Sequence, residues 1–187
     1  MGVRPSQAAQ ELDQEIGTIG YTVNLSMEAF LQDLYSRYTA MDQEEKKGVF
    51  QAQKLLTAYE SVTAQRQEVD ALNSDIAALP TPEELTRAQA PEVRQAQTRR
   101  SGLPRANQAF VDSKLDALLE KVAAYDADEA IAALPDAQKI TIADNAAVQK
   151  VLRQVAEVPA QWKGEITGLE RLEQIEKALN DLLEQME

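Results

Sequence analysis

Five arginines are the residues of this sequence best suited to binding another molecule by charge. They lie within 19 residues that contain a single acid, Glu92, which gives this stretch a charge of +4; they are Arg87, Arg94, Arg99, Arg100 and Arg105. Guanidinium groups spaced in this way can hold the carboxylates or phosphates of an anionic partner. They can equally pair with acidic helices of their own chain. The pattern therefore leaves two interpretations, a partner-binding surface and a set of intramolecular ion pairs.

An acidic cluster is the strongest candidate for a metal site, and it fails on spacing. A calcium loop of the EF-hand type that began at Asp126 would place Ile131 where glycine is required and Ala137 where a bidentate glutamate is required. Acids in the first turn of a helix cap its amides and favour its dipole. We therefore expect Asp126, Asp128 and Glu129 to be structural, and we expect no metal site.

The side chains that most enzymes use are missing from the sequence. It contains no Cys and no His, so thiolate, imidazole and Cys-ligated zinc chemistry are excluded. No glycine-rich phosphate loop or G-x-S-x-G motif is present. Neighbouring carboxylates such as Glu44 and Glu45 are expected on exposed helix faces, where their acidity is ordinary. We expect no catalytic residue, no cofactor and no enzymatic activity.

Composition indicates an all-α protein. Of 187 residues 44% are hydrophobic but only 5% are aromatic, and Gly and Pro number seven each. The net charge of −12 disfavours nucleic acid as a partner. No apolar run is long enough for membrane insertion, and the first residues lack the apolar core of a signal peptide.

A pentapeptide suggests a repeating architecture. Ile-Ala-Ala-Leu-Pro occurs at 76–80 and again at 131–135, which is 55 residues later, and Ile16 with Ile19 and Gly20 forms a related element 60 residues before Ile76. Adding 117 to positions after the first joint matches the apolar residues of the first and third segments, such as Leu31 with Val148, Leu55 with Leu172 and Val62 with Leu179. We predict three helical units with boundaries 6–65, 66–122 and 123–187.

Apolar spacing and capping residues predict the helices of these units. Ser26 is expected to cap a helix that extends to Met41, and Asp42 with Glu45 forms a capping box. A heptad pattern then predicts one helix over 42–79, about 57 Å long, that serves two units. We expect the whole chain to be an elongated array of three-helix bundles joined by such shared helices.

The middle unit has the weakest pattern. Between Pro80 and Pro104 it contains few apolar residues, its segment 87–105 is rich in arginine, and a short helix over 92–100 is expected to end at Ser101 and Gly102. The unit is either a degenerate bundle or a loop that packs on the long helices. A cap at Asp126 would interrupt its last helix, so the continuity of that helix is left open.

Two features of the third unit complete the sequence prediction. Trp162 is expected to anchor the turn before the last helix, and Tyr35, Tyr38 and Tyr59 elsewhere are likewise assigned to packing. The last helix stops where the first unit would still have half of its connecting helix to run. This favours a fragment of a longer array over a natural C-terminal helix.

These elements resemble the tandem helical modules of large Gram-positive surface proteins, including helical regions of S-layer proteins. The resemblance rests on the I-x-x-L-P joint, the extended turn 140–144, the helix start at 146–148, and the stretch from Tyr38 to Lys46. It covers most of 12–66 and 128–182, whereas Gly20 departs from the Pro of the pattern and the middle unit lacks its helix pattern. It implies three-helix units that act as stalks or spacers at the cell surface or outside the cell.

The leading hypothesis is a non-enzymatic spacer or interaction module of a larger bacterial surface protein, monomeric in preference to a coiled-coil dimer. One alternative is an adhesin segment that binds a host protein or a cell-wall polymer through the arginines. The other is an intracellular, cytoplasmic scaffold whose heptads pair between chains.

Overall fold

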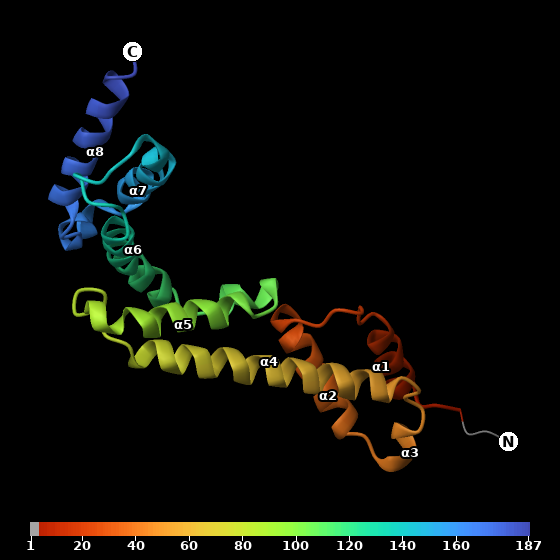
Figure 1. The fold of residues 1–187 in the computed structure, drawn as a ribbon. Coiled ribbons are helices and arrows are strands. Elements are labelled where there is room, and N and C mark those ends of the chain that lie inside the picture. The colour runs from red at the N-terminus through yellow and green to blue at the C-terminus, as the bar shows by residue number, and fades with distance from the viewer. Residues whose placement is uncertain (1–3) are drawn as a thin grey trace. The chain divides into compact units, whose positions relative to one another are not determined.

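The computed structural model describes residues 4–187, and these residues form helices and connecting segments without a β-strand. The all-α prediction is confirmed. Short 3-10 helices alternate with the α-helices along the chain (Figure 1). The α-helices are α1 (Gln7–Gly17), α2 (Glu28–Thr39), α3 (Gln43–Lys46), α4 (Ala52–Ala78), α5 (Ala90–Ser101), α6 (Lys114–Ala132), α7 (Asn145–Glu157) and α8 (Leu169–Glu184). The 3-10 helices are η1 (Leu25–Met27), η2 (Arg87–Gln89), η3 (Arg105–Phe110), η4 (Ile142–Asp144) and η5 (Ala160–Glu165).

The described chain divides into two compact units. The first comprises residues up to 75 together with 98–111, and the second comprises 76–97 together with 112–187. The division therefore falls inside α4 and inside α5. The three sequence units 6–65, 66–122 and 123–187 stay a prediction, since a grouping by tertiary contacts does not test a sequence repeat.

The first unit packs α1 against α2 and α3, and η1 against η3. The apolar positions that recur every three or four residues face its interior, as amphipathic helices require. Tyr35 and Tyr59 stack with ring centroids 3.8 Å apart, which confirms that these two tyrosines serve packing. Its buried residues include Ala9, Leu12, Ile16, Leu31, Leu34, Val49, Leu55, Val62, Val69 and Leu72.

The prediction of a single helix over 42–79 is wrong at its beginning. Asp42 does cap a helix, accepting a hydrogen bond from the Glu45 amide at 2.8 Å, but this helix, α3, has only four residues. The chain then turns at Gly48, where an added Cβ would lie 2.8 Å from Cβ of Pro5 and 3.1 Å from Cβ of Ala9. The backbone passes α1 so closely that only glycine fits, and α4 begins beyond this turn at Ala52.

The predicted cap at Ser26 is also wrong. Asn24 occupies the capping position of η1, and its side-chain oxygen accepts the Ser26 amide at 2.9 Å. Ser26 therefore donates to the cap instead of forming it. The 3-10 turn η1 precedes α2, which moves the start of the regular helix to Glu28.

The second unit packs α6 against α7, α8 and η5. A core cluster of this unit comprises Ala124, Ala127, Ile131, Leu134, Ile140, Val148, Val151, Val158, Ile166, Leu172, Ile175 and Leu179. Trp162 packs against this cluster, as predicted for the turn before the last helix. The open question at Asp126 is settled, because α6 runs through it without interruption from Lys114 to Ala132.

The short helix expected over 92–100 is present as α5, which begins two residues earlier and ends at Ser101. Pro91 lies in its first turn, where a missing amide costs nothing. Within residues 4–187, no helix combines the length and the apolar character needed to cross a bilayer.

Candidate functional site

The five arginines of the predicted partner surface do not belong to one compact unit. Arg87 in η2 and Arg94 in α5 lie in the second unit, whereas Arg99, Arg100 and Arg105 lie in the first. Each group is therefore described with the neighbours of its own unit.

In the second unit the two arginines meet the acidic cluster of α6. Arg87 Nη2 lies 2.7 Å from Asp128 Oδ2, and its guanidinium stands 4.8 Å from the centre of the Tyr125 ring. Arg94 pairs with Asp126 and lies 3.7 Å from a carboxylate oxygen of Glu129. The intramolecular pairing that the sequence left open is present at these two positions.

In the first unit one arginine forms an ion pair that is open to solvent. Arg99 pairs with Asp75 at 2.5 Å, and the exposed fractions of the two side chains are 39% and 67%. Such a pair contributes at most about 1 kcal/mol to the free energy of unfolding, because water competes for both charges. Arg100 is partly buried and has a partner, and Arg105 is exposed.

Asp128 of α6 is a carboxylate that accepts several hydrogen bonds. It is buried, and besides Arg87 it accepts the Thr167 amide at 3.2 Å, the Thr167 hydroxyl at 2.7 Å and the Gly168 amide at 2.8 Å. Burial alone would raise the pKa of Asp128, but these bonds to its charged form outweigh burial and lower it. The carboxylate thus caps the amino terminus of α8, forty residues along the chain.

Arg171, a cation in the first turn of α8, caps the carboxyl end of α6. The Arg171 guanidinium donates to the carbonyl oxygens of Ile131 and of Leu134, the latter at 2.7 Å, and pairs with Asp136 at 3.0 Å. These carbonyls belong to the last turn of α6 and the residues that follow it, where regular helical hydrogen bonding ends; the Ile131 carbonyl also accepts the Leu134 amide at 3.1 Å. Asp128 and Arg171 thus form reciprocal caps between the end of α6 and the start of α8.

The first unit contains the same arrangement between α1 and α4. Asp13 Oδ1 accepts the Gln51 amide at 2.8 Å just before α4 begins, and Gln51 Nε2 donates to the Asp13 carbonyl at 2.9 Å. In return, Lys54 Nζ of α4 lies 3.4 Å from the Gly17 carbonyl at the end of α1. An acid and a cation again meet the helix ends whose partial charges they complement.

Polar side chains also hold carbonyls near Ile76 in the sequence, and each unit has its own such contacts. In the first unit, Asn73 donates to the Phe110 carbonyl at 3.0 Å. In the second unit, Lys114 Nζ donates to the Leu79 carbonyl at 2.6 Å and lies 3.3 Å from that of Ala77. Asn73 thus stands where the other two joints have Asp13 and Asp128. Its side-chain amide donates to a carbonyl, whereas the two carboxylates accept from backbone amides.

Asp128 was expected to be structural, but its bond to a distant helix and the other capping residues were not predicted from the sequence, although their spacing carries a signal. Asp13, Asn73 and Asp128 each stand three residues before the joint isoleucine, at Ile16, Ile76 and Ile131. Lys54, Lys114 and Arg171 lie 60 and then 57 residues apart. A search for polar residues at the repeat period, instead of apolar ones alone, finds both series.

The other buried polar side chains also hold backbone. Asn107 accepts the Leu25 amide at 2.9 Å and donates to Gln65 Oε1 at 2.7 Å, within the first unit. Lys121 donates to the Pro82 carbonyl at 2.8 Å and lies 4.9 Å from the Trp162 ring centre, within the second. Both residues are less than one-twentieth exposed. Burying polar groups is tolerated where partners replace water, and here the partners are mostly connecting segments between helices.

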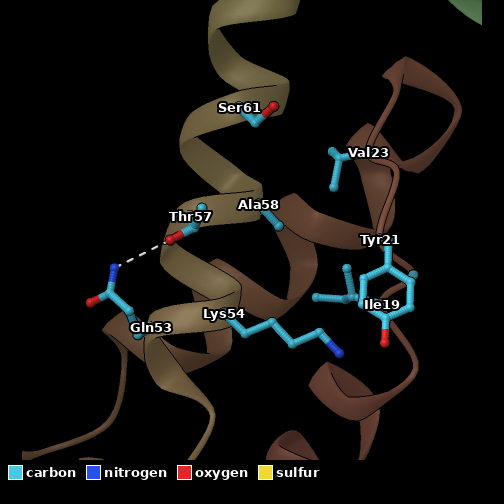
Figure 2. A pocket seen from close by; sticks show the side chains of 9 residues that line it. Ile19, Tyr21, Val23, Gln53, Lys54, Thr57, Ala58 and Ser61 are labelled. Carbon is cyan, nitrogen blue, oxygen red and sulfur yellow. Dashed lines mark hydrogen bonds between the residues drawn. The ribbon is translucent and has the colours of Figure 1, made fainter.

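One groove of the first unit is open to solvent and has an apolar floor. Its volume is about 390 Å³, and it lies between α4 and the α1–α2 connection; the lining residues are Ile19, Gly20, Tyr21, Val23, Gln53, Lys54, Thr57, Ala58 and Ser61. Figure 2 shows Lys54 extending from α4 toward Ile19 and Tyr21, while Ala58 faces the connection. The Tyr21 side chain is fully exposed.

Among residues 4–187, no group of three or more acidic side chains is arranged to hold a metal ion. The chemistry that these arrangements support is hydrogen bonding and ion pairing at helix ends. Comparison of the chain with protein-family models, with curated proteins and with solved structures finds no match.

Proposed function

We propose that this chain is a non-enzymatic structural spacer or interaction module of a larger bacterial surface protein. It would consist of tandem three-helix units in which one long helix closes a unit and opens the next. The observation that carries this proposal is the recurring pair of reciprocal helix caps. Asp13 with Lys54 and Asp128 with Arg171 make equivalent contacts at equivalent places in the two compact units.

The elements between the caps support the same proposal. Each of three successive segments has a 3-10 turn, an α-helix, a connection and a further α-helix, beginning at η1, η2 and η4. In all three segments the α-helix that follows the 3-10 turn has buried positions, as at Leu31 in α2, Val93 in α5 and Val148 in α7. Thr86 and Thr141 are 55 residues apart, and each stands at the cap of its 3-10 turn. The backbone amide of each donates to the side chain of the third residue beyond, Gln89 and Asp144 respectively.

A spacer has to hold the direction of the chain where one helix gives way to the next. A carboxylate at the amino end of a helix and a cation at the carboxyl end of its neighbour oppose fraying at both ends. Buried groups such as Asn107 and Lys121 fix the connections themselves. The buried polar groups thus make the connections rigid, which a spacer needs.

The joint residue Ile76 offers the sharpest test of the tandem model. It is fully buried, whereas its neighbour Ala77 is exposed on the same helix. Ile76→Asp should lower the melting temperature and change the small-angle scattering profile, because an unpaired charge cannot stay in the core. Ala77→Asp is the matched control and should leave both nearly unchanged. Equal results for the two variants would contradict a shared helix, and a scattering profile of a compact sphere would contradict an elongated array.

The surface-protein part of the proposal rests on the family resemblance. Limited proteolysis of intact source cells tests it, since a surface segment is cut before lysis. Protection of the segment until the cells are broken would favour the cytoplasmic scaffold instead. Sedimentation at several concentrations then decides between a monomer and a chain that pairs through its heptads.

A second candidate function is adhesion through the arginines of the first unit. Arg105 is exposed and Arg99 is more than one-third exposed, so these charges are accessible to an anionic partner. A pull-down with purified cell-wall polymer should lose signal when Arg99 and Arg105 are changed to Glu. Unchanged binding by this variant would remove the adhesin hypothesis for that surface.

A further inference from the structure

We propose that the groove of the first unit binds an acidic, proline-containing peptide segment from another protein. The inference uses the positional correspondence of the proposed tandem units, but it assigns a ligand that the spacer function does not require. In the second unit the equivalent helix face is already covered.

In the second unit the segment 79–85, which follows the end of α4, is held on α6 by side chains of that helix. Within it the Leu85 amide donates to the Thr81 carbonyl at 2.9 Å, so the segment forms a turn. Lys114 donates to the Leu79 carbonyl at 2.6 Å, Lys121 to the Pro82 carbonyl at 2.8 Å, and Tyr125 to the Leu85 carbonyl at 3.1 Å. Leu118, between the two lysines on the same face, is completely buried. This helix face is therefore a built site for a proline-containing connecting segment.

In the first unit the corresponding face belongs to α4. The residues 60 positions before Lys114, Leu118 and Lys121 are Lys54, Ala58 and Ser61, and all three line the open groove. Contacts at the two ends of the face correspond as well. Lys54 lies 3.4 Å from the Gly17 carbonyl, and Gln65 donates to the Val23 carbonyl at 2.9 Å.

The covering segment of the first unit is shorter by two residues. Val23 lies six positions after Gly17, whereas Leu85 lies eight positions after Ala77. In both units the anchoring side chains are eleven residues apart on their helix, a rise of about 16 Å. Six residues reach about 20 Å when extended, so the short connection has little slack to fold onto the helix. The groove of the first unit therefore lies at the place that corresponds to residues 80–83 in the second unit.

The groove lining indicates the chemistry of its ligand. None of the nine lining residues, all within the described chain, is acidic, and Lys54 places an ammonium group beside the apolar floor. On a chain of net charge −12 this favours an acidic ligand over a basic one. The exposed Tyr21 ring offers the flat apolar surface on which proline-rich segments in extended conformation dock.

The covering segment of the second unit supplies the probe for a binding experiment. The peptide LPTPEEL, identical to residues 79–85, carries two prolines and two acids. We expect a fluorescently labelled form to bind the full chain, measured as an increase in anisotropy. The charge-reversed peptide LPTPKKL should bind at least about tenfold more weakly, because its lysines meet Lys54.

Protein variants locate the binding. Ala58→Leu places in the groove the side chain that the second unit has at Leu118, and it should reduce affinity at least about tenfold by filling the floor. Lys54→Glu should weaken binding of LPTPEEL by about tenfold and improve binding of LPTPKKL. Tyr21→Ser, at a fully exposed side chain, tests the aromatic surface without a folding cost. Lys150→Glu, an exposed charge change in α7, is the control and should bind like wild type.

Circular dichroism of each variant separates loss of binding from loss of fold. Absence of binding by the folded wild type, or equal affinities of wild type, Ala58→Leu and Lys54→Glu, would overturn this proposal. Neither result would alter the scattering and melting comparison of Ile76→Asp with Ala77→Asp. The ligand proposal and the spacer proposal can therefore fail independently.

Discussion

The carboxylate of Asp128 accepts a hydrogen bond from the Gly168 amide at 2.8 Å, joining the interior of α6 to the start of α8 across forty residues of sequence. The pair shows how a helical chain with short connections fixes its turns. The side chain leaves one helix before its end and completes the first turn of another, where four amides lack helical partners.

Asp128→Asn should destabilise the second unit by about 2–3 kcal/mol. The NH2 group of the new side chain would face the donors of Thr167 and Gly168, and Arg87 would lose its anion. Trp162 is the only tryptophan and lies in the same unit, so its emission during urea unfolding reports this change. Glu129→Gln is the control. Its carboxylate is 64% exposed and 3.7 Å from Arg94, so the expected change is below about 0.5 kcal/mol. A similar loss for both variants would refute the capping role.

The contribution of Asp128 should also depend on pH in a defined direction. Its pKa in the folded chain lies below the ordinary value of 3.8, so folding favours the charged form. The stabilisation is present above the unfolded pKa and is lost as pH falls through the folded pKa. The difference in unfolding free energy between wild type and Asp128→Asn should be constant above about pH 5 and should shrink below about pH 4. A difference that grows on acidification contradicts the assignment.

Gly48→Ala should destabilise the first unit, since the added Cβ would lie 2.8 Å from Cβ of Pro5 and 3.1 Å from Cβ of Ala9. Neither neighbour has a flexible side chain that can retreat, so a loss of about 1–3 kcal/mol is expected. Gly164→Ala is the matched control, because nothing lies within 4 Å of its added Cβ. Thermal unfolding followed by circular dichroism compares the two. A Gly48→Ala protein as stable as the control would show that the turn can move away from α1.

Lys121→Met should alter the environment of Trp162 as well as stability. The methionine removes the donor to the Pro82 carbonyl and the cation that stands 4.9 Å from the indole ring centre. We expect a loss of about 1–3 kcal/mol and a changed Trp162 emission spectrum before unfolding begins. Lys139→Met, at an exposed lysine of the same unit, serves as control and should leave the native spectrum unchanged. An unchanged spectrum in Lys121→Met would place the ammonium group away from the ring in solution.

Sequence by itself determined the helices and most of their inward faces. Spacing of three and four residues marked positions such as Leu31, Leu55 and Leu179, all buried, because the helical period is a local property of the chain. The joints at Ile76 and Ile131 were visible for the same reason: helices α4 and α6 end at Ala78 and Ala132, before prolines that cannot continue them.

Only the tertiary structure decided where those helices break and what their charges meet. The turn at Gly48 depends on the approach of Pro5 and Ala9, and the cap of α8 depends on Asp128, forty residues away. Arg87 and Arg94 could have faced a partner, but their distances from α6 pair them with its acids. The groove over Ala58 likewise arises from a connection that is two residues shorter than its counterpart. Such relationships depend on distances between segments far apart in the chain, which hydrophobic periodicity does not encode.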